Sequence, residues 1–254
     1  EEYLNLAHAA GKPQSYTEVL IETGATEQAV DTAIENLSRP QSLLEIAQKL
    51  RENGHPTAAL EVAEHGLTVD GYHRDALAEW LRDRAASMDE PDLALRAAIT
   101  AFEESPSVST YQAVEELADD WERVRTELLA SLRDQNPSSN QAAEVFLQEQ
   151  LYDDAIDVAE RSGRSSVIET VVTGVKTERP QWVISTCKSQ AEPIIEQGKH
   201  DSYRTAVRWL RRAGEAAEAA NALEAWREYV ETLRDDHYRK YKLRPMLEDL
   251  LEEF

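Results

Sequence analysis

The chain is 254 residues long, with 49 acidic against 27 basic side chains, a net charge of -22 and a single cysteine. One cysteine excludes an internal disulfide and a multi-cysteine zinc site, and the excess of acid disfavours a broad nucleic-acid surface. No run of about 18 apolar residues occurs, so the sequence predicts no membrane-spanning helix, and we expect a cytoplasmic protein.

The acidic side chains are spread along the whole sequence, and the bases are mainly arginine. This distribution favours a halophilic protein, because concentrated salt screens like-charge repulsion to within about 3 Å at 1 M. An acidic surface that binds a basic partner is the alternative. The chain opens without an initiator Met or a signal peptide, so we expect it to be a piece of a longer protein.

Short amphipathic helices, separated by Gly, Pro, Asn or Asp, are predicted in succession. Residues 1–40 are expected to form N-terminal helices that begin a helical array. The apolar stripe from Leu43 to Leu50 predicts a helix that stops at residues 53–56, where Asn-Gly-His-Pro occurs. The next helix ends near Gly66, and Pro91 begins another one.

A degenerate repeat, Ala-(Leu/Ile)-x-x-Ala, occurs at residues 59–63, 94–98 and 155–159, and its first two copies are 35 residues apart. That spacing is close to the tetratricopeptide (TPR) period. Each copy opens the second helix of a predicted helix pair, where a small residue permits close packing. Residues 41–178 therefore predict degenerate helix-pair repeats. An irregular bundle is the alternative, since alanine is also simply a good helix former.

Residues 165–175 are rich in β-branched side chains, but their apolar spacing is helical. The predicted fold is therefore all-α: an α-α superhelix, or solenoid, of short helix-turn-helix repeats resembling TPR repeats. Residues 179–254 form the last predicted region.

Catalytic and metal-binding patterns do not occur in the sequence. The six histidines share no metal-ligand spacing, and no H-E-x-x-H, P-loop, G-x-G-x-x-G or G-x-S-x-G motif is present. Adjacent acids such as Asp119 and Asp120 are expected on solvated faces or at helix caps. Cys187 lies among apolar residues in a helical pattern and is expected to be a buried, inert thiol. The prediction is no enzyme, no cofactor and no metal site.

The last quarter of the chain has the clearest helical periodicity. Tyr203, Ala206, Val207 and Leu210 form one apolar face, and a second face begins at Trp226, so two helices are expected to pack together. Trp209 and Trp226 are expected in the core, with a base-stacking platform as the alternative.

This quarter also carries the only concentrated positive charge, which we call the basic island. It is expected to bind an acidic partner, contact nucleic acid, or pair internally with the surplus carboxylates. Its members are Arg204, Arg208, Arg211, Arg212, Arg234, Arg239, Lys240, Lys242 and Arg244.

About 70 residues of this region resemble the terminal region of bacterial and archaeal SWIM-type zinc finger proteins. The similar stretches are residues 180–184 (PQWVI), 191–195 (AEPII), 203–213, 224–230 and 237–247 (HYRKYKLRPML). The resemblance implies that the chain is the helical C-terminal region of such a protein, and we expect a haloarchaeal one. It implies zinc only upstream, in a Cys-x-Cys…Cys-x-His element that this chain lacks.

The sequence thus predicts a non-catalytic helical-repeat scaffold that mediates protein–protein interaction within a larger SWIM zinc finger protein. The alternative is a nucleic-acid-binding accessory domain that uses the basic island at residues 204–244. The partner is expected to be another protein, with nucleic acid as a further possibility through the parent protein and no membrane.

Overall fold

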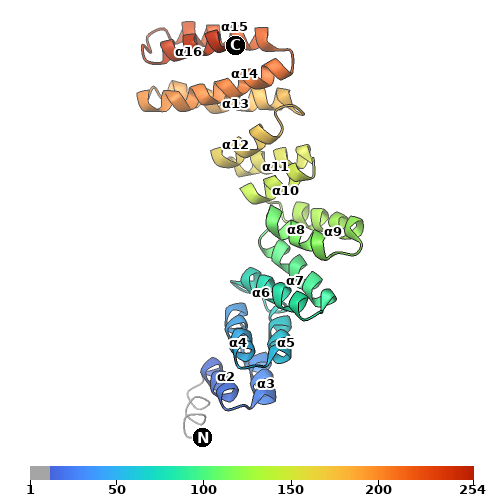
Figure 1. Ribbon diagram of the computed structural model, residues 1–254. Helices are drawn as coiled ribbons and strands as arrows, with labels where there is room; N and C mark the ends of the chain where they lie inside the picture. The colour runs from blue at the N-terminus through green and yellow to red at the C-terminus, as the bar shows by residue number, and fades with distance from the viewer. Residues whose placement is uncertain (1–11) are drawn as a thin grey trace. The chain divides into compact units, whose positions relative to one another are not determined.

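The computed structural model describes residues 12–254, and within them it contains fifteen α-helices, one short 3-10 helix and no strand (Figure 1). The all-α prediction is confirmed. Residues 1–11 of the expected N-terminal helices, including His8, lie outside the described residues. In the described range, no helix combines the length and apolar character needed to cross a bilayer.

The chain divides into two compact units. The first unit extends to Gln135, and the second covers Asn136–Phe254. The three segments predicted from the sequence, 1–40, 41–178 and 179–254, stay predictions. The helices of the first unit are α2 (Pro13–Glu22), α3 (Thr26–Asn36), α4 (Pro40–Glu52), α5 (Pro56–Gly66), α6 (Arg74–Ser87), α7 (Pro91–Glu104), α8 (Val108–Leu117) and α9 (Trp121–Asp134).

Local sequence explains where many of these helices begin. Proline occupies the first turn of α2, α4, α5 and α7, a position where its missing N–H would be unpaired in any case. Helix α8 begins with a capping box, in which Ser107 and Thr110 each accept a backbone N–H from the other. Asp120 caps α9 by accepting from the backbone N–H of Arg123 at 3.4 Å, as expected for an acid at a helix start.

Helices α2 to α7 of the first unit pack as successive pairs. Helix α2 packs on α3, α4 on α5 and α6 on α7, while α2 also contacts α4 and α4 contacts α6. The second helices are in contact too, because α3 packs on α5. Figure 1 shows α4 and α5 side by side as one such pair. The first two pairs therefore pack on each other through equivalent helices, and the row of first helices continues from α4 to α6.

The alanine motif lies where the sequence predicted it, at the second helix of a pair. Helices α5 and α7 carry the first two copies, and α11 in the second unit carries the third. All six motif alanines are at most 1 % exposed: Ala59, Ala63, Ala94, Ala98, Ala155 and Ala159. Their small side chains allow the close contact between paired helices.

At Gly66, helices of the first unit lie so close together that even a methyl side chain would clash. It is the last residue of α5, and it is buried. A Cβ atom at this position would lie 2.4 Å from Cδ1 of Leu77 on α6 and 3.5 Å from Cβ of Leu43 on α4. Leu77 and Leu43 are both fully buried. Three helices therefore converge on a site that only glycine fits without rearrangement.

The second unit contains α10 (Asn140–Gln148), α11 (Tyr152–Ser162), α12 (Ser165–Gly174), α13 (Pro180–Glu196), η1 (His200–Ser202), α14 (Tyr203–Ala219), α15 (Leu223–Asp236) and α16 (Leu243–Glu253). Helices α10, α11 and α12 pack on one another, and α13 pairs with α14 over a long interface. Helices α15 and α16 contact each other and α14. The β-branched segment at α12 is helical, as its spacing predicted.

Trp226 on α15 anchors the last helices of the second unit. It is 1 % exposed, and its indole N–H donates to the carbonyl oxygen of Leu210 on α14 at 3.2 Å. Its ring meets Phe254 edge-on at 5.0 Å between centroids. Gly214 leaves room for both rings, because a Cβ there would lie 3.0 Å from each. The predicted packing of the two C-terminal helices is confirmed.

Candidate functional site

Four members of the basic island form ion pairs with carboxylates of the same chain. Arg211 donates from Nε to both oxygens of Glu253 at 2.9 Å. Arg212 contacts Glu169 on α12, and Arg234 and Arg244 pair with Asp235 and Glu248. These pairs are partly solvent-exposed, so each contributes little to the stability of the fold. Internal pairing therefore accounts for much of this positive charge.

Neighbouring arginines on α14 have different environments. The ion pair that Arg212 forms with α12 is supported by stacking, because its guanidinium carbon lies 5.1 Å from the ring centroid of Trp209. Arg204, Arg208 and Arg211 instead follow one another at spacings of four and three residues, which places them on one face of the helix. All four arginines belong to the basic island, but Arg212 makes a different contact from the other three.

The loop between α15 and α16, residues 237–242, presents the remaining bases beside exposed rings. Tyr238 and Tyr241 are 58 % and 69 % exposed. Arg239 lies over the ring of Tyr238, whereas the ammonium of Lys240 donates to the backbone carbonyl of Ile195 at the end of α13. We call this segment the α15–α16 turn. The hydrogen bond from Lys240 holds the turn against the end of α13.

A groove of about 540 Å³ lies between α14 and α16. We call it the α14–α16 groove; its lining residues are Arg204, Val207, Arg208, Arg211, Met246 and Asp249. Val207 is 7 % exposed, and with Met246 it gives the groove an apolar part. The three arginines come from α14, and Asp249 is the single acidic residue among the lining side chains. The groove therefore combines positive charge with an apolar surface.

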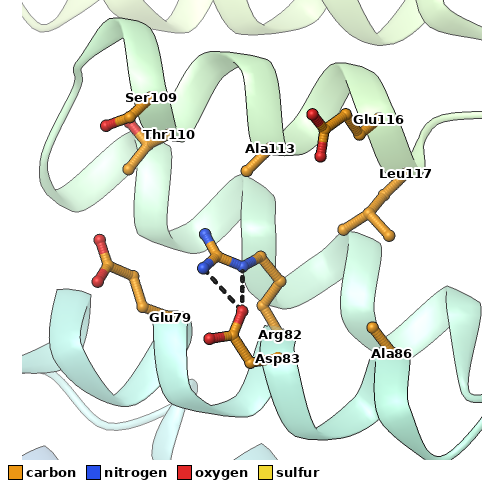
Figure 2. Close-up of a pocket in the computed structure, with 9 residues that line it drawn as sticks. All are labelled: Glu79, Arg82, Asp83, Ala86, Ser109, Thr110, Ala113, Glu116 and Leu117. Carbon is orange, nitrogen blue, oxygen red and sulfur yellow. Dashed lines mark hydrogen bonds and ion pairs between the residues drawn. The ribbon is translucent and has the colours of Figure 1, made fainter.

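A second hollow, of about 470 Å³, lies between α6 and α8 in the first unit, and we call it the α6–α8 pocket. Figure 2 shows Arg82 extending from α6 toward α8, with its guanidinium bound to Asp83. Nε of Arg82 donates to that carboxylate at 2.9 Å. Glu79 on α6 and Glu116 on α8 also line the pocket. Three carboxylates and one guanidinium leave the pocket negatively charged.

Sequence reasoning missed the acidic members of both sites. None of the four, Glu79, Asp83, Glu116 and Asp249, was singled out from the sequence. Helical spacing does place Glu79 with Asp83, and Met246 with Asp249, on shared faces. That signal cannot indicate which other helix completes each site, because helix partners are set by tertiary packing.

Cys187 is fully buried, and burial raises the pKa of its thiol to about 12. Such a thiol is almost entirely protonated at neutral pH and is a poor nucleophile. Trp209 and Trp226 are 3 % and 1 % exposed, which leaves neither ring free as a stacking platform. Across residues 12–254, no three His, Cys, Asp or Glu side chains gather closely enough to hold a metal ion.

Comparison with known proteins supplies no identity. No family model and no curated protein matches the chain. A solved structure described as "DHF58 filament" is 19% identical, over 98% of this chain and 94% of that one, with a TM-score of 0.15.

Proposed function

We propose that the chain is a non-catalytic scaffold of TPR-like helical repeats that binds other proteins. The observation that carries the proposal is the packing of the first helices α2, α4 and α6 in a row. Both the α6–α8 pocket and a further hollow of about 510 Å³, lined mainly by the start of α2 and the α3–α4 connection, lie beside these helices. Stacked helix pairs commonly bind partners along one such helical layer.

The charge of the α6–α8 pocket indicates what a partner segment should carry. In the described part of the chain, Glu79 and Glu116 form no ion pair, whereas Asp83 is neutralised by Arg82. Two uncompensated carboxylates on facing helices favour a lysine or arginine of the partner. The partner of the first unit is therefore proposed to be a protein with a basic segment.

The proposal also includes the larger protein to which this chain would belong. The resemblance of residues 180–247 to SWIM-type zinc finger proteins supports a role as the helical region of a larger, cytoplasmic protein of that kind. The net charge of -22 supports a halophilic origin. Under this proposal the chain itself holds no cofactor, and any zinc belongs to a separate part of the parent protein.

The experiment compares two neighbouring glutamates of α8. Glu116 lines the pocket and Glu115 does not, although both are exposed. Tagged chain is cross-linked in cells of its source organism, and the captured proteins are quantified by mass spectrometry. We expect Glu116→Lys, combined with Glu79→Lys, to lose partners that Glu115→Lys retains. Equal capture by both variants, or a reproducible catalytic activity without any partner, contradicts the proposal.

The exposed tyrosines of the α15–α16 turn favour nucleic-acid binding as a second candidate function. Tyr238 and Tyr241 stand beside Arg239 and Lys242, and aromatic rings next to cations are suited to stacking on single-stranded bases. Affinity for a labelled single-stranded oligonucleotide should then fall steeply with salt and disappear in Arg239→Glu/Lys242→Glu. Absence of binding at low salt by the folded chain excludes this candidate.

A further inference from the structure

Three arginines of α14 line the α14–α16 groove, and carboxylates of residues 12–254 do not neutralise all of them. Arg211 is bound by Glu253, but Arg204 and Arg208 form no ion pair among the described residues. Arg208 has only a long hydrogen bond, 3.4 Å, to the hydroxyl of Thr205. Like charges four residues apart on a helix repel one another. An external anion would remove this repulsion.

Other cations on the helices around α14 are neutralised by carboxylates of the chain. Arg212 and Lys176 are paired with Glu169 and Glu215 across helices, although acids are in excess over the whole chain. Arg204 and Arg208 are both exposed, and the one carboxylate that shares their groove is Asp249. Two arginines of the groove are therefore left without a carboxylate partner among the described residues.

The groove also has an apolar component, which a simple anion would not use. Val207 lies between Arg204 and Arg208 along the helix, and Met246 faces the groove from α16. Methionine adapts its shape to different apolar side chains. The suitable ligand carries carboxylates on both sides of an apolar side chain.

We propose that the α14–α16 groove binds an acidic amphipathic helix of a partner protein. From Arg204 to Arg211 the rise along α14 is about 10 Å, so glutamates at positions i and i+4 of the partner can meet Arg204 and Arg208, and one at i+7 can reach Arg211 beside Glu253. A leucine between them lies against Val207 and Met246. This binding surface is an addition to the proposed scaffold function. It rests on that proposal only in the assumption that the chain binds proteins.

Nucleic acid fits the groove less well than an acidic helix. The rings suited to base stacking, Tyr238 and Tyr241, belong to the α15–α16 turn and are not among the lining residues. A polyanion is also repelled by the net charge of -22 over its whole length. An acidic helix needs only the local positive row and gains from the apolar contact.

The test uses the full 254-residue chain and a fluorescein-labelled, lactam-stapled peptide of 14 residues. The peptide has Glu at three positions spaced four and three apart and one Leu on the same face; its control has Gln in place of Glu. Fluorescence anisotropy in low salt gives the affinity. We expect Arg204→Glu/Arg208→Glu to weaken binding by tenfold or more, since charge-assisted hydrogen bonds are lost and repulsion is introduced.

Matched variants distinguish binding at the groove from a general effect of the chain's net charge. Arg239→Glu/Lys242→Glu changes the net charge equally but lies outside the groove, so we expect less than a twofold effect. Asp249→Asn should strengthen binding, and Met246→Ala should weaken it without changing the charge. Circular dichroism verifies that each variant is folded.

Three results overturn the proposal: no binding of the Glu peptide, equal binding of the Gln peptide, or equal losses in the two double variants. Preferential binding of a single-stranded oligonucleotide at the groove also overturns it. None of these results bears on the α6–α8 pocket, whose test depends on Glu116 and Glu79.

Discussion

Replacement of Gly66 by alanine tests how closely the helix pairs of the first unit pack. The added Cβ would lie 2.4 Å from Cδ1 and 3.3 Å from Cδ2 of Leu77. Both distances are shorter than normal carbon–carbon contacts, and Leu77 is fully buried. The leucine cannot rotate into solvent, so α5 and α6 must separate or Leu77 must leave its preferred rotamer.

Two opposing effects set the expected magnitude. Alanine in place of glycine in a helix stabilises by up to about 1 kcal/mol. Overpacking of a well-packed core costs about 1–3 kcal/mol. Because Gly66 is the terminal residue of α5, the helical gain is at the low end, and we expect net destabilisation of about 1–2 kcal/mol. For a chain of this size the corresponding fall in Tm is about 2–8 °C.

Hydrogen exchange with mass spectrometry locates the effect, while urea unfolding followed by circular dichroism gives its size. Faster exchange is expected in α4, α5 and α6 and not in the second unit. Leu77→Ala alone should cost about 2–5 kcal/mol; in the Gly66→Ala background it should cost less, because the new methyl group occupies part of the space. A Gly66→Ala chain that is more stable than the original would refute the close approach of α5 and α6.

The remaining predictions concern single side chains. Cys187, with a pKa of about 12, should not react with a thiol reagent at pH 8 in the folded chain and should react rapidly in urea; rapid native labelling would contradict its burial. Ser107→Ala removes the cap that accepts from the backbone N–H of Thr110 and should destabilise the chain by about 0.5–2 kcal/mol in urea titrations, and an unchanged midpoint would contradict this role of the cap. Trp226→Phe leaves the carbonyl of Leu210 without its indole donor and should cost about 1–3 kcal/mol, whereas an unchanged midpoint would show that this hydrogen bond contributes little.

The helices were predictable because their signals are local. Proline at Pro40, Pro56 and Pro91 marks helix starts, and the buried alanines of the repeated motif mark second helices. Even the β-branched α12 was assigned by its spacing. These features depend on residues within one or two turns of each other, which a sequence displays directly.

The sites were less predictable, because they depend on residues far apart in the chain. Arg211 and Arg212 are adjacent, yet their carboxylate partners, Glu253 and Glu169, lie 42 and 43 residues away in opposite directions. Helical periodicity predicted that Val207 lies on the apolar face of its helix. It did not predict that Met246 lies across the groove from Val207. Long-range pairing of helices is a property of the whole unit, and no local pattern encodes it.

The pairing of consecutive helices also affects how the protein is made. A ribosome adds about 5–20 residues per second, so the stretch from Pro40 to Gly66, which forms α4 and α5, takes about 1–5 seconds to synthesise. Helices form within about a microsecond. Each pair can therefore close before the next pair has been translated, and at any moment the nascent chain exposes little more than the apolar face of its newest hairpin.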